Sequence, residues 1–235
     1  MNMTRARLLR ITGVIGLIAG PISLIVTTVM QWMLQAANPT ATVYEVIAQN
    51  QAAWLTLGIL SVFGLLVWLA GIPAVIDRVP GRGWVLTTGG GLVTAIGLAA
   101  GIGHLALFFG TDAVLAADGL GGPARELLDK AAGQEPLGSL LLVVFLAAFS
   151  LGPILMTIGL RRAKAVAVWV PVTAIIMTVA NFVGGVPAGI VQLAALVATF
   201  VPIVVTVLRA PTAAPAPAAK SDADGARSGH ALRSE

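Results

Sequence analysis

The sequence predicts an all-α fold: a polytopic integral membrane protein built as a six-transmembrane-helix bundle with short outer amphipathic helices. The chain is 57% hydrophobic and only 10% charged over 235 residues, whereas a soluble domain is about a quarter charged. Its apolar segments are about 20 residues long, which lets a helix cross a hydrocarbon core of about 30 Å. Basic residues recur at every second connection between these segments, as expected for a chain threaded back and forth through a membrane.

The predicted spans cover approximately residues 11–31, 53–76, 84–110, 138–160, 165–183 and 187–208, with ends uncertain by about 2–4 residues. The last two are the closest together. The Gly-Gly-x-Pro sequence between them favours a tight turn, because glycine and proline interrupt helices. A single helix over 165–208 would be about 64 Å long, twice what a bilayer needs. Two helices are therefore expected.

The basic residues predict which ends share a side of the membrane. One side would carry Arg5, Arg7, Arg10, Arg78, Arg82, Arg161, Arg162, Lys164 and Arg209. The other would carry only Arg125 and Lys130, among Asp112, Asp118, Glu126, Asp129 and Glu135. The positive-inside rule then places both termini in the cytoplasm. The Arg- and Ala-rich composition is typical of a GC-rich bacterial genome, so the expected location is the bacterial cytoplasmic (plasma) membrane.

The tryptophans fit this threading. Trp32 and Trp54 fall at predicted outer ends and Trp84 and Trp169 at predicted inner ends, as expected for indoles in the headgroup region. Trp68 lies deeper and is expected to pack inside the bundle. A cleavable signal peptide is the alternative for the first span, although about 20 apolar residues exceed the usual apolar region of about 7–15. Cleavage would leave five spans.

Three regions are expected: a basic N-terminus over 1–10, the membrane domain over 11–209, and a cytoplasmic tail over 210–235. The tail is rich in Ala and Pro without an apolar period, so it is predicted to be disordered, with its His230 solvated. In the outer segments, Thr42 and Glu45 are spaced as a capping box, and Pro123 favours the start of a second short helix. These helices would cap the bundle or, alternatively, form a lid.

Few polar groups are available for a site. The predicted spans contain no acid, lysine or arginine, and the candidate ligand-binding residues are His104, Asn181, Gln192 and, above them, Asp112. At 100° per residue, each of the first three shares a helix face with small residues, so each is expected to point into the bundle. They could meet in the outer half of the membrane as a pocket, or could simply form interhelical hydrogen bonds.

Close-packing motifs mark two helices. Gly16 and Gly20, and likewise Gly97 and Gly101, have the GxxxG spacing that lets helices approach closely. We therefore expect either face to bind a membrane-protein partner or a second copy of the chain. The lipid bilayer is the other expected partner. Nucleic acid is not expected, because the basic residues are scattered over loops without a stacking platform.

No catalytic, metal or cofactor signature is present. The chain has no cysteine, a haem held by two histidines would need a second histidine in the membrane, and neither a zinc motif nor a nucleophile elbow occurs. No catalytic residue, metal or cofactor is expected. The sequence favours a non-enzymatic membrane protein, an accessory or partner-binding subunit. The alternative is a small-solute or lipid-handling transporter with an outward-facing pocket around His104.

Overall fold

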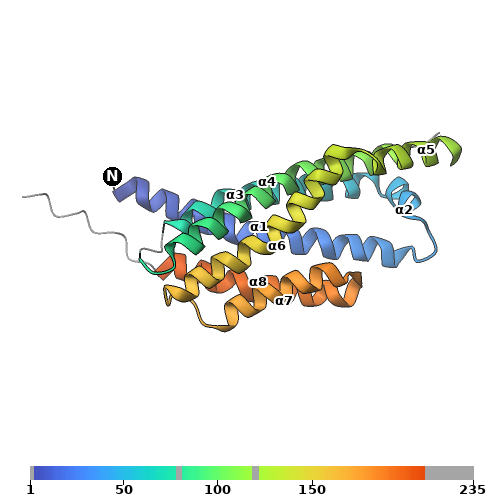
Figure 1. Cartoon of the computed structure of the whole chain (residues 1–235). Coiled ribbons are helices and arrows are strands. Elements are labelled where there is room, and N and C mark those ends of the chain that lie inside the picture. Colours follow the sequence, from blue (N-terminus) through green and yellow to red (C-terminus); the bar gives the residue numbers. More distant parts are fainter. Residues whose placement is uncertain (1–2, 78–80, 118–121, 210–235) are drawn as a thin grey trace, which may run out of the picture.

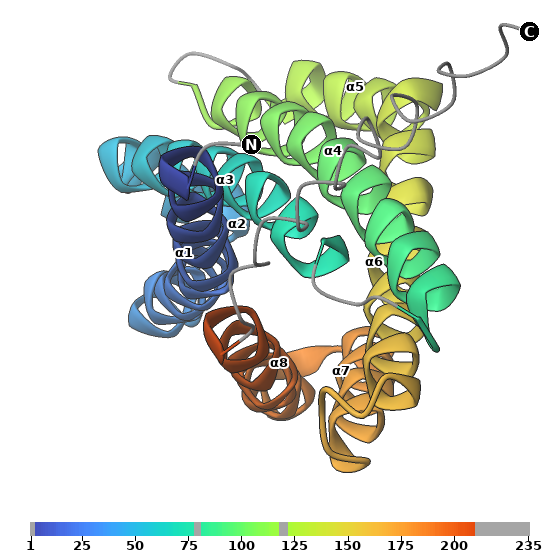
Figure 2. The same cartoon turned by 90° about the vertical axis from the view of Figure 1, so that its left-hand side faces the viewer.

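The computed structural model describes residues 3–77, 81–117 and 122–209. This part of the chain is entirely helical, without a strand. Figures 1 and 2 show the helices side by side as one bundle. They are α1 (Met3–Ala37), α2 (Val43–Gln49), α3 (Gln51–Ile76), α4 (Trp84–Leu115), α5 (Gly122–Gly133), α6 (Pro136–Arg162), α7 (Trp169–Val183) and α8 (Gly185–Arg209). The predicted tail, Arg78 and Asp118 lie outside the described residues.

Five of these helices are long and apolar enough to cross a membrane: α1, α3, α4, α6 and α8. The chain is thus a helical membrane protein, as predicted, but the predicted fifth span is shorter than expected. Helix α7 begins at Trp169 and not at residue 165, and its 15 residues extend only about 22 Å, less than the hydrocarbon thickness of about 30 Å. The count of six spans is therefore not established by helix length.

The late start of α7 results from the way α6 ends. Lys164 adopts a left-handed conformation with φ of 58°. The amide of Lys164 donates to the Arg161 carbonyl at 2.9 Å and that of Ala165 donates to the Leu160 carbonyl at 2.9 Å. These two bonds form a Schellman motif, which closes a helix and turns the chain away from its axis. Several residues are then needed before α7 can begin.

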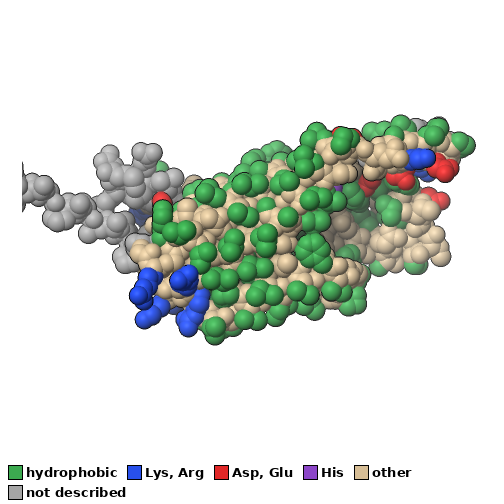
Figure 3. Space-filling model, in the orientation of Figure 1, with side chains coloured by type: hydrophobic (Ala, Val, Ile, Leu, Met, Phe, Trp, Pro, Cys, Tyr) green, Lys and Arg blue, Asp and Glu red, His purple; other side chains and the backbone are tan. Residues whose placement is uncertain are grey.

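The two ends of the bundle carry opposite charge. The start of α1, the end of α8 and the α6–α7 connection lie at one end, whereas α2 and α5 lie at the other (Figure 1). Lys and Arg side chains gather at the first end and acidic side chains at the second, with a largely apolar surface between them (Figure 3). We call these the basic end and the acidic end. The grouping of the basic connections is the one that the sequence predicts.

Helices α4 and α6 form the most extensive contact. A stripe of small residues on α4 faces α6, consisting of Thr87, Gly90, Thr94, Gly97 and Gly101, and continues from Gly83 before the helix. A Cβ atom at Gly97 would lie 2.6 Å from the Phe149 backbone nitrogen, and one at Gly90 would collide with the Met156 nitrogen. The backbones therefore touch directly, which side chains larger than glycine would prevent.

The other glycine motif packs α1 against α3. A Cβ atom at Gly16 would lie 2.9 Å from the Gly71 nitrogen, and one at Gly20 would collide with the Trp68 side chain. Both predicted partner faces are therefore covered by helices of the same chain: Gly16 and Gly20 by α3, and Gly97 by α6. These glycines therefore close the monomer, and the binding of a partner or a second copy of the chain stays a prediction.

Trp68 lies at the centre of the bundle and is fully buried. Its indole meets Phe149 of α6 edge-on at a centroid distance of 5.3 Å and Phe200 of α8 at 4.8 Å. These edge-to-face pairs, together with Gly20 of α1, join four helices around one side chain. The predicted packing role of Trp68 is confirmed.

Trp54 lies in the first turn of α3, toward the acidic end, where it was predicted, but its side chain is not exposed. It is buried, and its indole Nε1 donates to the Phe109 carbonyl at 3.2 Å. Helix α2 covers this region, with Ile47 in the same apolar cluster. The short helix α2 therefore shields Trp54, and its place at a membrane interface stays a prediction. Trp84 and Trp169, by contrast, are exposed at the basic end.

The α4–α6 contact generates a prediction about two adjacent glycines. Gly90→Ala should lower the free energy of unfolding by about 1–3 kcal/mol, because its methyl group is forced into the Met156 backbone. Gly89→Ala is the matched control: its Cβ has nothing within 4 Å, and alanine favours the helix by about 1 kcal/mol. Thermal unfolding in one detergent compares the two. Equal melting temperatures would contradict the close contact.

Candidate functional site

Asn181 and Gln192 are brought together by the hairpin of α7 and α8. The Gln192 side-chain amide donates to the Asn181 side-chain oxygen at 2.8 Å. Both side chains are half-buried. Each therefore satisfies part of the other's hydrogen-bonding capacity at the closed end of the hairpin, beside the Gly184–Gly185 turn. Both glycines there have positive φ, 72° and 77°, which explains why the turn requires them.

Further polar bonds join this hairpin along its length. Thr199 of α8 donates to the Thr173 hydroxyl of α7 at 3.0 Å. Near the basic end, the Thr206 hydroxyl lies 3.1 Å from the Ala165 carbonyl, to which it donates. Interhelical bonds of this kind contribute about 0.6–2 kcal/mol each in membranes. For Asn181 and Gln192 the arrangement is the one that structural hydrogen bonding predicts.

His104 has a different environment. Its ring stacks on Phe108 at a centroid distance of 6.3 Å, and it is half-buried on α4. Within the described residues its imidazole makes no hydrogen bond. The contacts therefore give no support to the alternative role of His104, a structural hydrogen bond between helices. The binding of a ligand by His104 stays a prediction.

Asp112 lies two turns beyond His104 on α4, about 12 Å along the helix axis. It is half-buried and belongs to a polar group at the acidic end that also contains Tyr44 and Asp129. The Tyr44 hydroxyl of α2 donates to the Asp129 carboxylate of α5 at 2.7 Å, and the Arg125 guanidinium lies 5.7 Å from the centroid of the Tyr44 ring. This group, which we call the outer polar cluster, ties α2 to α5.

Sequence reasoning missed most of the outer polar cluster. Tyr44 and Asp129 are 85 positions apart in the sequence. The only feature of the sequence that linked them was that both lie in the predicted outer segments. The local prediction in the same region is confirmed: Thr42 and Glu45 form the capping box, with the Thr42 amide donating to the Glu45 carboxylate at 2.7 Å. This bond lowers the pKa of Glu45.

The predicted pocket residues thus form separate groups. Asn181 and Gln192 bond to each other on α7 and α8, while His104 and Asp112 lie on α4, which packs against α3 and α6. Among the described side chains, no hydrogen bond connects one group to the other. No set of three potential metal-binding side chains occurs in the described ranges either.

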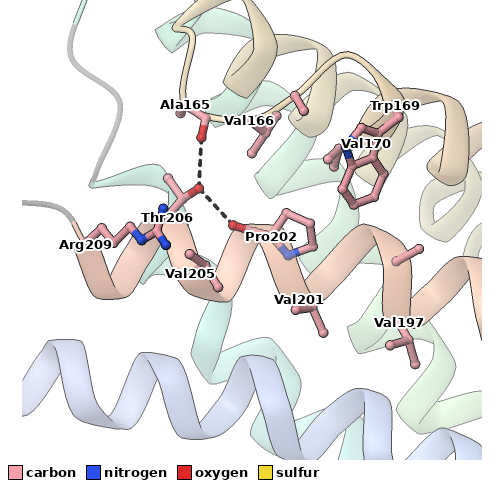
Figure 4. A pocket seen from close by; sticks show the side chains of 12 residues that line it. Ala165, Val166, Trp169, Val170, Val197, Val201, Pro202, Val205, Thr206 and Arg209 are labelled. Atoms are coloured by element: carbon pink, nitrogen blue, oxygen red, sulfur yellow. Dashed lines mark hydrogen bonds between the residues drawn. The ribbon is translucent and has the colours of Figure 1, made fainter.

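Two grooves offer larger volumes. One, of about 550 Å³, lies between α3 and α4 near the acidic end, where Trp54, Phe63 and Phe109 contribute to apolar walls and Gln51 is the most polar lining residue. The other, of about 640 Å³, lies between α7, α8 and the α6–α7 connection at the basic end (Figure 4). Its walls are also apolar, but Arg209 lies at one end of it. The predicted ligand-binding residues line neither groove: His104, Asn181, Gln192 and Asp112.

Comparison with protein-family models, with curated proteins and with solved structures gave no match. The chemistry of the chain must therefore be inferred from its own geometry. Within the described residues, that geometry provides hydrogen-bonded polar pairs, the His104 imidazole and two apolar grooves.

The outer polar cluster predicts an unusual titration. Burial, and then the hydrogen bond to the Asp129 carboxylate, raise the pKa of Tyr44 from 10.0 to about 12. Because the folded state favours the neutral phenol, the stability from this contact is present below pH 10 and is lost as the pH rises through about 12. Tyr44 is the only tyrosine of the chain, so the near-ultraviolet absorbance of tyrosinate reports its pKa directly.

Asp129→Asn should move the Tyr44 titration back toward 10, because the negative charge beside the phenol is removed. Glu126→Gln on the same helix is the matched control and should leave it unchanged. A wild-type midpoint near 10 would contradict the contact.

His104→Leu should leave the melting temperature unchanged or raise it, since no hydrogen bond to the described residues is lost. Asn181→Leu, in contrast, should destabilise the protein by about 1–2 kcal/mol, because Gln192 then loses its partner. Thermal unfolding of both variants in the same detergent makes the comparison. A marked loss of stability in His104→Leu would show that the imidazole is structural after all.

Proposed function

We propose that this chain is a non-enzymatic integral membrane protein that serves as an accessory or partner-binding subunit in the bacterial cytoplasmic membrane. The observation that carries the proposal is the filled centre of the bundle, where Trp68 meets Phe149 and Phe200. A protein that moves a polar solute needs a polar path through its centre. Here that position holds aromatic rings.

The use of the polar residues also supports a binding role. Asn181 and Gln192 bond to each other, and Thr173 bonds to Thr199. These bonds stabilise the hairpin and occupy hydrogen-bonding groups that a substrate would otherwise use. An acid–base mechanism would need a second functional group within hydrogen-bond reach of His104, and the neighbour that stacks on its ring is Phe108.

The second candidate function is a small-solute or lipid-handling transporter, for which the site would be a groove that His104 does not line. The groove between α3 and α4 favours it, because about 550 Å³ of apolar space near the acidic end could hold an acyl chain. A small polar solute would find few partners there. We rank this candidate second because the groove lies beside the sealed centre and does not pass through it.

The proposed orientation places the basic end, with both termini, in the cytoplasm and α2 and α5 outside. The charge separation between the two ends supports it (Figure 3). An even number of crossings follows, in which α7 would be the short fifth of six spans. Bonds from α7 to α8 allow a short helix to be held at the depth of its longer neighbour.

Helix α5 offers the best surface for the partner. Its Leu127 is 71% exposed and Leu128 is also exposed, on a helix outside the apolar spans. The lipid-facing surfaces of α1, by contrast, carry regularly spaced Ile and Val, such as Ile15 and Ile22. Large apolar side chains exposed outside the membrane suit a protein contact.

The absence of cysteine from the sequence allows a direct test with single-cysteine variants. Leu127→Cys should react with a membrane-impermeant maleimide in intact cells, whereas Lys164→Cys should react only after permeabilisation. A photoactivatable cross-linker attached at Leu127→Cys should then join the chain to one defined polypeptide. Ile22→Cys, which faces lipid, is the control and should yield lipid adducts alone.

Two results would contradict the proposal. Labelling of Lys164→Cys in intact cells would reverse the orientation. Lipid adducts alone from Leu127→Cys would place α5 on the membrane surface without a partner, and would favour the lipid-handling alternative.

A further inference from the structure

We propose that the groove between α7 and α8 at the basic end binds one anionic phospholipid, with an acyl chain along α8 and the phosphate at Arg209. This site goes beyond the proposed partner-binding role and does not depend on it. Three features of the groove support the inference: its apolar walls, its dimensions and its charge.

The walls are those of a hydrocarbon site. The hairpin is closed at its Gly184–Gly185 turn and separates toward the basic end, where α6 leads into α7. There Trp169 and Val170 line the groove from α7 and Val197 and Val201 line it from α8, and Arg209 lies beside Thr206 at its end (Figure 4). The Thr206 hydroxyl is already used, since it donates to the Ala165 and Pro202 carbonyls. The groove therefore provides few hydrogen-bond partners for a polar solute along its apolar walls.

The length of the groove matches one leaflet. Val197, Val201, Val205 and Arg209 follow one another at four-residue intervals and so lie along one side of α8. From the first to the last is about 18 Å, close to the thickness of about 15 Å for half of the hydrocarbon core. An acyl chain beside the valines would place its headgroup at Arg209. Trp169, which is 48% exposed, lines the same groove, as expected for an indole near the headgroups.

The basic residues near the groove favour an anionic lipid headgroup. Arg209 is exposed at the end of α8. Arg161 and Arg162 end α6, and Lys164 lies in the connection that follows. Asp77, at the end of α3, is the single described acid at this end, and it does not line the groove. Guanidinium groups bind phosphates strongly through paired hydrogen bonds. The groove between α3 and α4 has similar volume but no cation in its lining, so the same inference does not extend to it.

The short α7 explains why a lipid would be held there. A helix of about 22 Å cannot match the hydrocarbon core by itself, and such mismatch is relieved when lipid or neighbouring residues adapt. A phospholipid lying in the groove would cover the apolar side of α8 that α7 leaves open. This arrangement distinguishes a specific lipid from the general lipid annulus.

The test uses the full chain, purified in detergent micelles that contain phosphatidylglycerol or phosphatidylcholine with identical acyl chains. Native mass spectrometry counts the lipids retained, and the rise in melting temperature with lipid concentration gives the apparent affinity. The wild type should bind phosphatidylglycerol more tightly. Arg209→Gln should weaken this binding about five-fold while leaving phosphatidylcholine binding unchanged.

Two further variants locate the site. Arg82→Gln removes an exposed basic residue of the same end that does not line the groove, and it should preserve the preference for phosphatidylglycerol. Val201→Trp, at an exposed position, fills the groove and should weaken binding of both lipids without unfolding the protein. If Arg209→Gln fails to fold, Val201→Trp alone decides the case.

Equal binding of the two lipids by the wild type would overturn the proposal. So would an equal loss in Arg82→Gln and Arg209→Gln, which would indicate a diffuse attraction to the whole basic end. Unchanged phosphatidylglycerol binding in Val201→Trp would place the lipid elsewhere.

Discussion

The direct backbone contact between α4 and α6 is the constraint on which the rest of the bundle depends. Lipid provides no hydrophobic force to join two apolar helices, so their association depends on close van der Waals contact. Glycine at positions 90, 97 and 152 brings the two backbones into that contact. Helix α3 packs on another side of α4, α1 packs on α3, and α8 returns to α1. Moving α4 away from α6 would therefore displace each of these helices in turn.

Most polar residues of the spans likewise find their hydrogen-bond partners within the chain. A buried polar group in a membrane requires a partner, and most threonines in the spans donate to a carbonyl of their own helix, as Thr94 and Thr157 do. The α7–α8 hairpin uses its amides and hydroxyls to hold a helix too short to be stable by length alone. What is left for function lies at the edges of the bundle: an imidazole, an outer polar cluster and two apolar grooves.

Much of this fold could be predicted from composition and local pattern. Five spans, the Thr42 capping box, the Gly184–Gly185 turn and the packing of Trp68 all follow from signals contained in a few neighbouring residues. The short α7 could not be predicted, because hydropathy over 165–183 does not reveal that Lys164 adopts a left-handed conformation.

Long-range contacts were the other source of error. The Gly16 and Gly97 motifs correctly indicated close helix contact but not which helix would make it, since that depends on the whole bundle. The sequence did not reveal that α2 buries the side chain of Trp54. The bond between Tyr44 and Asp129 joins two short helices, α2 and α5, and nothing in the sequence of either helix indicates this contact. For the candidate site, Asn181 and Gln192 meet as the sequence suggested, but no hydrogen bond among the described side chains joins His104 or Asp112 to them.

The central claim is tested most directly by solid-state NMR of the protein in lipid bilayers, with ¹³C at the glycine Cα atoms and ¹⁵N at the methionine amides. None of the six methionines is adjacent to a glycine in the sequence, so a through-space signal between the two labels must come from a contact beyond directly bonded neighbours. The structure predicts a signal between Gly90 and Met156. Its absence from well-ordered samples would contradict the backbone contact of α4 with α6, and with it the arrangement of the bundle.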